Sequence, residues 1–259
     1  MAKKRSNHVP SANRPPPTDH GNLLLAALPT LDYDRIVRPL EIVPLRLKQM
    51  LHQPGTPIAD VYFPADGFCS ELTVLGDGRM VEVATIGREG VVGLLGDSGH
   101  GPVTSATMVQ APTSTSVKMP AAFFRQEMTR RGPFFDLVSR YRFALVRFIM
   151  QSTACNAVHT VEERLARWLL TAEDHLRTNA FPLTQELAAM MLGVTRPTVS
   201  DVAATLQRAG LITYHRGFVT IVDRERLEAA ACECYAITAA VVDRFRRENR
   251  GGERPYEAG

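Results

Sequence analysis

Residues 184–212 combine side chains that can contact DNA with the residues that two short helices need. Arg196 is the side chain we expect to read a base, because arginine can bond the O6 and N7 atoms of guanine together. Thr198 and Ser200 are short hydroxyl donors suited to phosphate or to close base approach. The same surface is expected to carry Thr184, Gln185, Thr195, Pro197 and Asp201. The segment therefore predicts sequence-directed DNA binding.

Two helices joined at Gly193 must position these side chains. Thr184 can cap a first helix that starts at about residue 185, and Gly193 supplies the positive φ of a sharp turn. Thr195 can cap the second helix, with Pro197 in its first turn, where a missing amide costs nothing. The alternative is a packed helix pair without DNA contact. A helix-turn-helix is favoured because cap, glycine and apolar positions are satisfied together.

Residues 211–222 predict a β-hairpin after the second helix. The segments LITYH (211–215) and FVTIV (218–222) alternate like strands on either side of a turn. His215 and Arg216 at its tip could contact phosphate, although an arginine in an exposed turn is often only solvated. Asp223 can cap a further helix. The hairpin is therefore expected to act as a wing.

These residues resemble the winged helix-turn-helix of the Crp/Fnr transcription regulators. Residues 159–176 resemble that family's first DNA-domain helix, with Thr160 and Glu163 as a capping box. Arg196 matches the family's base-reading arginine in the pattern R-x-T-V, here R-P-T-V. Pro197 and Asp201 depart from the glutamate and second arginine of the best-known members, so their operator is not transferred. The expected partners are double-stranded DNA, a second copy of the chain, RNA polymerase and an unidentified small-molecule effector.

The N-terminal half predicts two short helices followed by a series of strands. The strand-like segments are VYFPADGFCSELTVL (61–75), MVEVATIG (80–87), GVVGLL (90–95), SATMVQA (105–111) and STSVKMP (114–120). Such short, evenly spaced strands are typical of a β-roll. The expected fold is α+β: a β-roll like a cyclic-nucleotide-binding domain, with flanking helices, a long dimerisation helix and a C-terminal winged helix-turn-helix. The expected boundaries are a basic tail (1–20), the sensor roll (21–132), the long helix and hinge (133–159), the DNA-binding domain (160–235), and a helix end with a basic tail (236–259).

The resemblance places an effector pocket in the roll, but the phosphate-binding residues are missing. Nucleotide-binding members carry a Gly-Glu pair and an arginine followed by Ser or Thr, whereas here Leu94 follows Gly93 and no arginine follows Arg88 before residue 111. A buried phosphate left unpaired is costly, so dependence on cyclic AMP is not expected. Arg88 and Glu89 form a surface ion pair in the simplest interpretation. The expected pocket, suited to a neutral or apolar effector, comprises Arg88, Glu89, Gly93, Leu94, Thr104, Ser105, Thr107, Ile149 and Met150. A non-standard nucleotide pocket and a regulator without any ligand remain alternatives.

Residues 133–159 predict a long helix with a wide apolar stripe. Such a helix could pack on the roll alone or also against its copy in a second subunit, and the width of the apolar surface favours both contacts. Two recognition helices about one DNA turn apart would then read a near-palindromic operator. The expected dimer face comprises Phe134, Val138, Tyr141, Leu145, Phe148, Ser152 and Cys155.

Composition excludes several other classes. The 259 residues, 45% of them hydrophobic, can fill two modest domains with separate cores, and a net charge of +3 would not by itself reveal a DNA-binding protein. The absence of a membrane-length apolar run or a signal peptide predicts a cytoplasmic protein. The cysteines, Cys69, Cys155, Cys232 and Cys234, are scattered except for one C-x-C, a spacing weaker than the C-x2-C pairs of metal sites, and the seven histidines are dispersed. We therefore expect neither a metal site nor a cofactor, including the iron–sulfur cluster of one branch of the resembled family. The sequence contains neither a phosphate-binding glycine loop nor a nucleophile elbow, so we do not expect an enzyme. A protein-interaction role for the winged helix is the remaining alternative.

Overall fold

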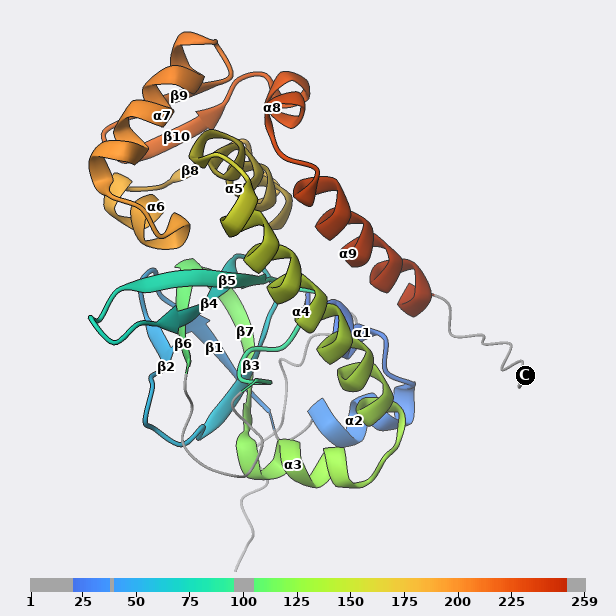
Figure 1. The fold of residues 1–259 in the computed structure, drawn as a ribbon. Helices are drawn as coiled ribbons and strands as arrows, with labels where there is room; N and C mark the ends of the chain where they lie inside the picture. Colours follow the sequence, from blue (N-terminus) through green and yellow to red (C-terminus); the bar gives the residue numbers. More distant parts are fainter. Residues whose placement is uncertain (1–20, 38–39, 96–104, 251–259) are drawn as a thin grey trace, which may run out of the picture.

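The computed structural model describes residues 21–37, 40–95 and 105–250, so the predicted N-terminal tail and Thr104 lie outside it. Two antiparallel sheets, in the strand orders β1-β7-β3 and β2-β6-β4-β5, form the N-terminal domain (Figure 1). Its elements are α1 (Leu23–Ala26), α2 (Thr30–Val37), β1 (Glu41–Leu45), β2 (Met50–His52), β3 (Asp60–Pro64), β4 (Phe68–Val74), β5 (Met80–Ile86), β6 (Ser105–Ala111), β7 (Thr113–Pro120) and α3 (Ala121–Thr129).

Two of the predicted strands differ in the structure. Residues 61–75 form two strands rather than one run, because the chain turns at Gly67, where φ is +62°. A Cβ at Gly67 would lie 2.5 Å from the carbonyl oxygen of Pro112, so no larger residue fits that turn. Residues 90–95 form no regular strand. Val92 makes only an isolated bridge to Tyr62, and its side chain is buried in the core.

The long helix α4 (Pro133–Val158) confirms the predicted helix and ends at an abrupt hinge. His159 is extended, with φ −97° and ψ 150°, and Thr160 caps the following helix α5 (Val161–Leu176). The predicted capping box is present: the Thr160 hydroxyl accepts from the amide of Glu163, whose carboxylate accepts from the Thr160 amide at 2.8 Å. Only residues 159 and 160 therefore separate the long helix from the C-terminal domain.

The C-terminal half is a three-stranded sheet, in the order β8-β10-β9, packed with helices. A last helix, α9, runs back beside α4 (Figure 1). Its Phe245 is buried and packs edge-to-face against Tyr141 of α4, with ring centroids 5.8 Å apart. Residues 244–250, expected as part of the C-terminal basic tail, are helical. The elements are β8 (Ala180–Pro182), α6 (Gln185–Leu192), α7 (Arg196–Arg208), β9 (Ile212–His215), β10 (Phe218–Ile221), α8 (Arg224–Ala230) and α9 (Cys234–Arg250).

One sheet of the N-terminal domain contributes to the hydrophobic core of the C-terminal domain. Phe68 and Leu72 of β4 point away from the interior of the roll and pack in one cluster with Trp168 of α5 and Leu192 of α6. The rings of Phe68 and Trp168 are edge-to-face, with centroids 6.1 Å apart. Two separate core clusters are therefore present, as expected, and one face of the β2-β6-β4-β5 sheet completes the second, which belongs to the C-terminal domain.

Candidate DNA-binding site and its surroundings

The helix pair α6–α7 has the caps and the turn that its sequence predicts. The hydroxyl of Thr184 accepts from the amide of Leu187 at 3.2 Å, and that of Thr195 accepts from the amide of Thr198 at 3.4 Å. Gly193 ends α6 with φ +66°, in the left-handed region that favours glycine. These local interactions fix where α7 begins and therefore where its first turn meets solvent.

Arg196 lies exposed at the first turn of α7. Its Nε donates to Glu186 Oε1 of α6 at 2.9 Å, and both side chains are more than half exposed. Such a pair contributes about 0–1 kcal/mol, so a guanine or a phosphate can replace Glu186 at little cost. Around Arg196 the predicted contact residues Thr195, Pro197 and Asp201 are exposed, whereas Thr184, Gln185, Thr198 and Ser200 are half-buried.

The wing is a hairpin with a two-residue turn. Arg216 and Gly217 both have positive φ, at +50° and +75°, which suits the tight turn between paired His215 and Phe218. His215 and Arg216 are exposed at the tip. Leu183, just before α6, donates its amide to the Gly217 carbonyl at 2.8 Å. The wing is thus tied to the start of the helix pair.

Tyr214 makes a second attachment of the wing. Its hydroxyl donates to the Leu183 carbonyl at 2.7 Å, and its backbone amide donates to Gln207 Oε1 of α7 at 2.7 Å. Burial raises the pKa of Tyr214 to about 12, so the phenol remains a neutral donor at physiological pH. Wing, α6 and α7 therefore form one rigid unit.

The helix-turn-helix also contacts the sensor sheet directly. The turn at Gly193 faces Val81 of β5 so closely that an added Cβ would lie 3.0 Å from Val81 Cγ2. In the same interface, Trp168 Nε1 donates to Glu82 Oε1 at 3.1 Å. Burial raises the pKa of Glu82. A change in the orientation of β5 would consequently move α6 and α7.

The predicted effector residues do not line one cavity. Leu94 is buried in the core, and Met150 is 66% exposed on α4. The hydroxyls of Ser105 and Thr107 both donate to the buried carboxylate of Glu71, the second at 2.7 Å. A carboxylate at this position opposes an anionic ligand, which strengthens the expectation that the phosphate site is lost. Gly93, with φ +98°, packs against His52, and Ile149 packs half-buried against the roll.

Glu89 is not at the surface, so the interpretation of Arg88 and Glu89 as a surface ion pair is wrong. Glu89 is 1% exposed, and its Oε1 accepts from the amide of Gly87 at 2.9 Å. Its Oε2 lies 3.7 Å from His175 Nδ1 of α5. Glu89 therefore links the loop after β5 to α5 of the C-terminal domain.

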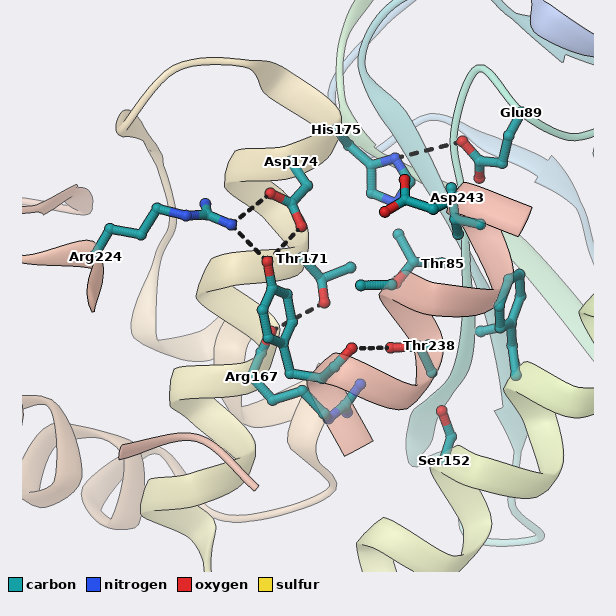
Figure 2. Close-up of a pocket in the computed structure, with 15 residues that line it drawn as sticks. Thr85, Glu89, Ser152, Arg167, Thr171, Asp174, His175, Arg224, Thr238 and Asp243 are labelled. Atoms are coloured by element: carbon teal, nitrogen blue, oxygen red, sulfur yellow. Dashed lines mark hydrogen bonds and ion pairs between the residues drawn. The ribbon is translucent and has the colours of Figure 1, made fainter. Parts of the chain in front are cut away.

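A cavity of about 300 Å³ lies next to this pair, between the two domains and α9. In Figure 2, His175 faces Glu89 on one side of it, and Arg224 faces Asp174 on another. Sequence reasoning missed this pocket because its walls come from elements far apart in the chain. The lining includes Ala84, Thr85, Glu89, Phe148, Ser152, Arg167, Thr171, Asp174, His175, Arg224, Tyr235, Thr238, Ala239, Val242 and Asp243.

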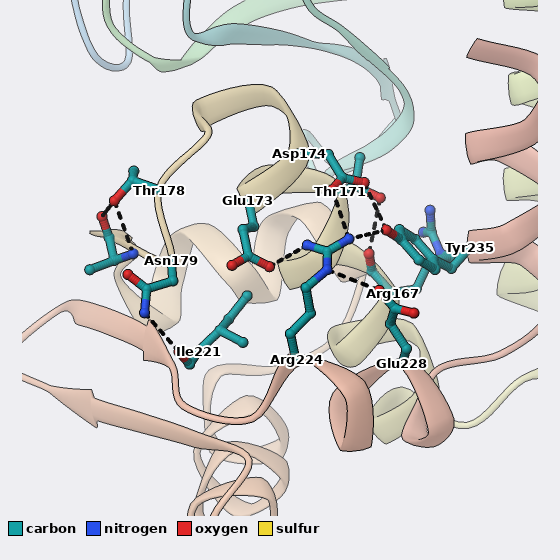
Figure 3. A network of polar contacts seen from close by, with 11 residues as sticks. Arg167, Thr171, Glu173, Asp174, Thr178, Asn179, Ile221, Arg224, Glu228 and Tyr235 are labelled. Carbon is teal, nitrogen blue, oxygen red and sulfur yellow. Dashed lines mark hydrogen bonds and ion pairs between the residues drawn. The ribbon is translucent and has the colours of Figure 1, made fainter. Parts of the chain in front are cut away.

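Arg224 joins three helices at the rim of the pocket. Its guanidinium bonds to Glu173 and to Asp174 of α5, the latter at 2.9 Å, and to Glu228 of α8, also at 2.9 Å (Figure 3). It also donates to the hydroxyl of Tyr235 in α9. The network holds α8 and α9 against α5 and so fixes one wall of the cavity.

The residues predicted for a dimer face are used within the chain itself. Phe134, Val138, Tyr141, Leu145, Phe148 and Cys155 are all less than 9% exposed in the single chain, and Ser152 lines the pocket. That assignment is therefore wrong. The opposite side of α4 instead exposes Phe143 (75%), Val146 (42%), Met150 (66%) and Val158 (74%). The roll, α3 and α9 together cover the side of α4 that sequence reasoning had assigned to a partner.

The structure gathers residues that the sequence scatters. Cys155 and His159, at the end of α4, meet Cys232 and Cys234, at the junction of α8 and α9. The expectation of dispersed, unrelated cysteines is wrong for these three. Only the C-x-C spacing hinted at a cluster, and nothing in the sequence could place it against α4. Cys69 is buried elsewhere, in the core of the roll.

Comparison with known proteins agrees with this architecture. Residues 163–230 match the model of the Crp-like helix-turn-helix domain. The fold is similar to FixK2 from Bradyrhizobium japonicum, with a TM-score of 0.62 and 18% identity over 74% of this chain and 98% of that chain. It is also similar to TTHB099, a CRP-family transcriptional regulator from Thermus thermophilus, with a TM-score of 0.60 and 20% identity over 74% and 99%. The fold is similar as well to TTHA1359, a CRP/FNR-family regulator of the same organism, with a TM-score of 0.61 and 17% identity over 74% of this chain and 98% of that chain. No curated protein matches the chain.

Together these findings define the fold: an N-terminal β-sheet domain, the long helix α4, and a C-terminal winged helix-turn-helix of the Crp type. No helix in the described part of the chain is long and apolar enough to cross a bilayer. Residues 163–230 are thus similar to the Crp-like helix-turn-helix domain, and the fold of the chain is similar to those of solved Crp/Fnr-family regulators.

Proposed function

We propose that the chain is a homodimeric regulator that reads a near-palindromic operator through Arg196 and positions itself through its wing. One observation carries this proposal: the three DNA-facing parts are contiguous. A Cβ on Gly217 of the wing would lie 3.5 Å from the Thr184 side chain at the start of α6. Glu186 of α6 in turn holds Arg196 of α7 at 2.9 Å. A single surface thus offers a base reader flanked by sites for phosphate.

The test is the DNA affinity of Arg196→Ala against a matched control. Genome-wide mapping of binding sites first supplies the operator, and fluorescence anisotropy at fixed salt then gives dissociation constants. Loss of a bidentate contact to guanine should cost about 1–3 kcal/mol, or roughly 5- to 150-fold, and relax specificity at one operator position. Arg208→Ala, at the far end of α7, is the control. Unchanged affinity in Arg196→Ala would favour the protein-interaction role for the winged helix.

We infer that the dimer forms through the exposed apolar face of α4, namely Phe143, Val146, Met150 and Val158. This face is continuous at helical spacing, and large apolar side chains left in solvent mark an interaction site. It also ends at the hinge, so pairing there sets the separation of the two copies of α7. RNA polymerase is the further partner we propose, testable by transcription from an operator-bearing promoter.

Cyclic AMP is not the proposed effector. The hydroxyls of Ser105 and Thr107 are engaged by the buried Glu71, so they are not available to a phosphate. A small-molecule effector would act more directly in the cavity between the domains than in the predicted pocket of the roll. In that cavity a ligand contacts both domains and can favour one orientation of the hinge. We expect cyclic AMP and cyclic GMP to leave the melting temperature unchanged. Stabilisation at micromolar concentration would contradict this assignment.

A further inference from the structure

Four side chains that bind soft metal ions converge at the hinge. Cys155 and His159 are one helical turn apart at the end of α4, and Cys232 and Cys234 flank Glu233 just before and at the start of α9. Their sulfur and ring-nitrogen atoms all lie within 4.8 Å of one another. The three cysteines are buried and His159 is half-buried, so the cluster faces the protein interior.

The spacing of these atoms fits one tetrahedral ion. Zn–S bonds of about 2.3 Å place the ligands of a tetrahedral site about 3.7 Å apart along each edge. The Cys155 and Cys232 sulfurs are 3.5 Å apart, and the Cys234 sulfur is 3.6 Å from His159 Nδ1. An iron–sulfur cluster would hold its cysteine sulfurs further apart, because several iron atoms lie between them. The geometry therefore favours a single ion over a cluster.

Neighbouring groups orient the ligands as they do around bound metals. His159 Nε2 lies 3.1 Å from the carboxylate of Glu233, which leaves Nδ1 turned toward the cysteines. A carboxylate on the far nitrogen is the usual partner of a metal-binding histidine, since it fixes the tautomer and the ring orientation. Gln151 Nε2 donates to the Cys234 sulfur at 3.0 Å, an interaction that stabilises a thiolate.

Two arginines supply the compensating charge. Three thiolates and a neutral histidine around Zn²⁺ carry one net negative charge. Arg164 and Arg167 of α5 both lie within electrostatic reach of Cys155. Arg164 is 7% exposed, and among the described residues the Nε atoms of both arginines have no hydrogen-bond partner. Buried positive charge of this kind stabilises an anionic metal complex.

We propose that Cys155, His159, Cys232 and Cys234 form a Zn²⁺ site that ties the end of α4 to the start of α9. On binding, the three thiols release their protons to solvent and coordinate as thiolates, and no electron is transferred. Four protein ligands leave no open position, so the ion is structural. Because His159 is itself one of the two hinge residues, the ion fixes the hinge. If the proposed function holds, zinc occupancy therefore sets the orientation of the DNA-binding domain.

Metal analysis of the purified full-length protein tests the site without reference to DNA. We expect one zinc per chain by plasma mass spectrometry in protein kept reduced and free of added metal. Cys155→Ser and Cys234→Ser should lose it, whereas Cys69→Ala, the control at the buried cysteine of the roll, should keep it. Co²⁺ replacement should give the thiolate charge-transfer and ligand-field bands of a tetrahedral site. The proposal would be overturned if the protein held no metal, if it held iron or copper in place of zinc, or if both serine variants kept full zinc.

A variant that keeps all four ligands guards against loss of metal through misfolding. Glu233→Gln should weaken zinc binding about 10- to 100-fold in competition with a chromophoric chelator, because the carboxylate that orients His159 is lost. Glu225→Gln, an exposed glutamate of α8, should match the wild type. Equal affinity of the two variants would contradict the assigned role of His159. Operator affinity before and after chelation then measures the coupling to DNA; a zinc-loaded protein that does not bind DNA would refute the proposed function and leave the site intact.

Discussion

Removal of the Phe143 side chain should weaken the dimer strongly while leaving the subunit folded. Burying a whole phenylalanine stabilises by about 1.5–3 kcal/mol. Phe143 is 75% exposed in the single chain, so pairing could bury most of the ring. Each copy then contributes about 1–2 kcal/mol, and two copies about 2–4 kcal/mol. Phe143→Ala should therefore raise the dimer dissociation constant roughly 30- to 1,000-fold.

Sedimentation equilibrium over a wide concentration range measures this constant. Leu31→Ala is the matched control, because Leu31 is 85% exposed on α2, away from the proposed face. Thermal unfolding at a concentration where the wild type and Phe143→Ala are both monomeric should show equal stability, because the exposed Phe143 contributes little to the core of the single chain. A dissociation constant within about threefold of the wild type, or a wild type that never dimerises, would refute the reasoning.

Three further substitutions test the interfaces between elements. Burial raises the pKa of Glu82 above 4.5, so the stability it contributes is full below that pH and is lost as pH rises through the raised value. Glu82→Gln should make the free energy of unfolding, measured with urea at several pH values, depend less on pH than in the wild type. The same pH dependence in both proteins would argue against this role of Glu82. Gly193→Ala should cost at least about 1 kcal/mol through its positive φ and its contact with Val81, and a neutral effect would contradict that contact. Tyr214→Phe should cost about 0.5–1.5 kcal/mol and loosen the wing, seen as faster amide exchange at Gly217; unchanged exchange would exclude the anchoring role.

The helix-turn-helix could be predicted from the sequence because its determinants are local. Thr184, Gly193 and Thr195 act within three or four residues of their own positions, through caps and a backbone conformation that no distant contact needs to supply. The capping box at Thr160 is equally local. Whether Arg196 reads a base stays a prediction, although its exposure agrees with that role.

Other features depended on contacts that the sequence pattern does not contain. Both sides of α4 are apolar, and only the positions of the roll and of α9, with Phe245 in the core, decide which side is left for a partner. Residues 90–95 are as apolar as a strand because they are buried, not because they pair. The cysteine cluster joins residues 77 positions apart, brought together by the return of the chain along α4.

The last turn of α4 connects the two proposals. Cys155 points into the chain and Val158 is 74% exposed on the other side, so adjacent positions serve the proposed zinc site and the proposed dimer face. In the dimer, Val158 fixes the distance between the two helix ends, while the ion fixes how each DNA-binding domain leaves its helix at His159. The separation and tilt of the two copies of α7 depend on both. Loss of zinc should therefore change operator affinity without dissociating the dimer, whereas loss of the Phe143 side chain should dissociate the dimer with zinc still bound.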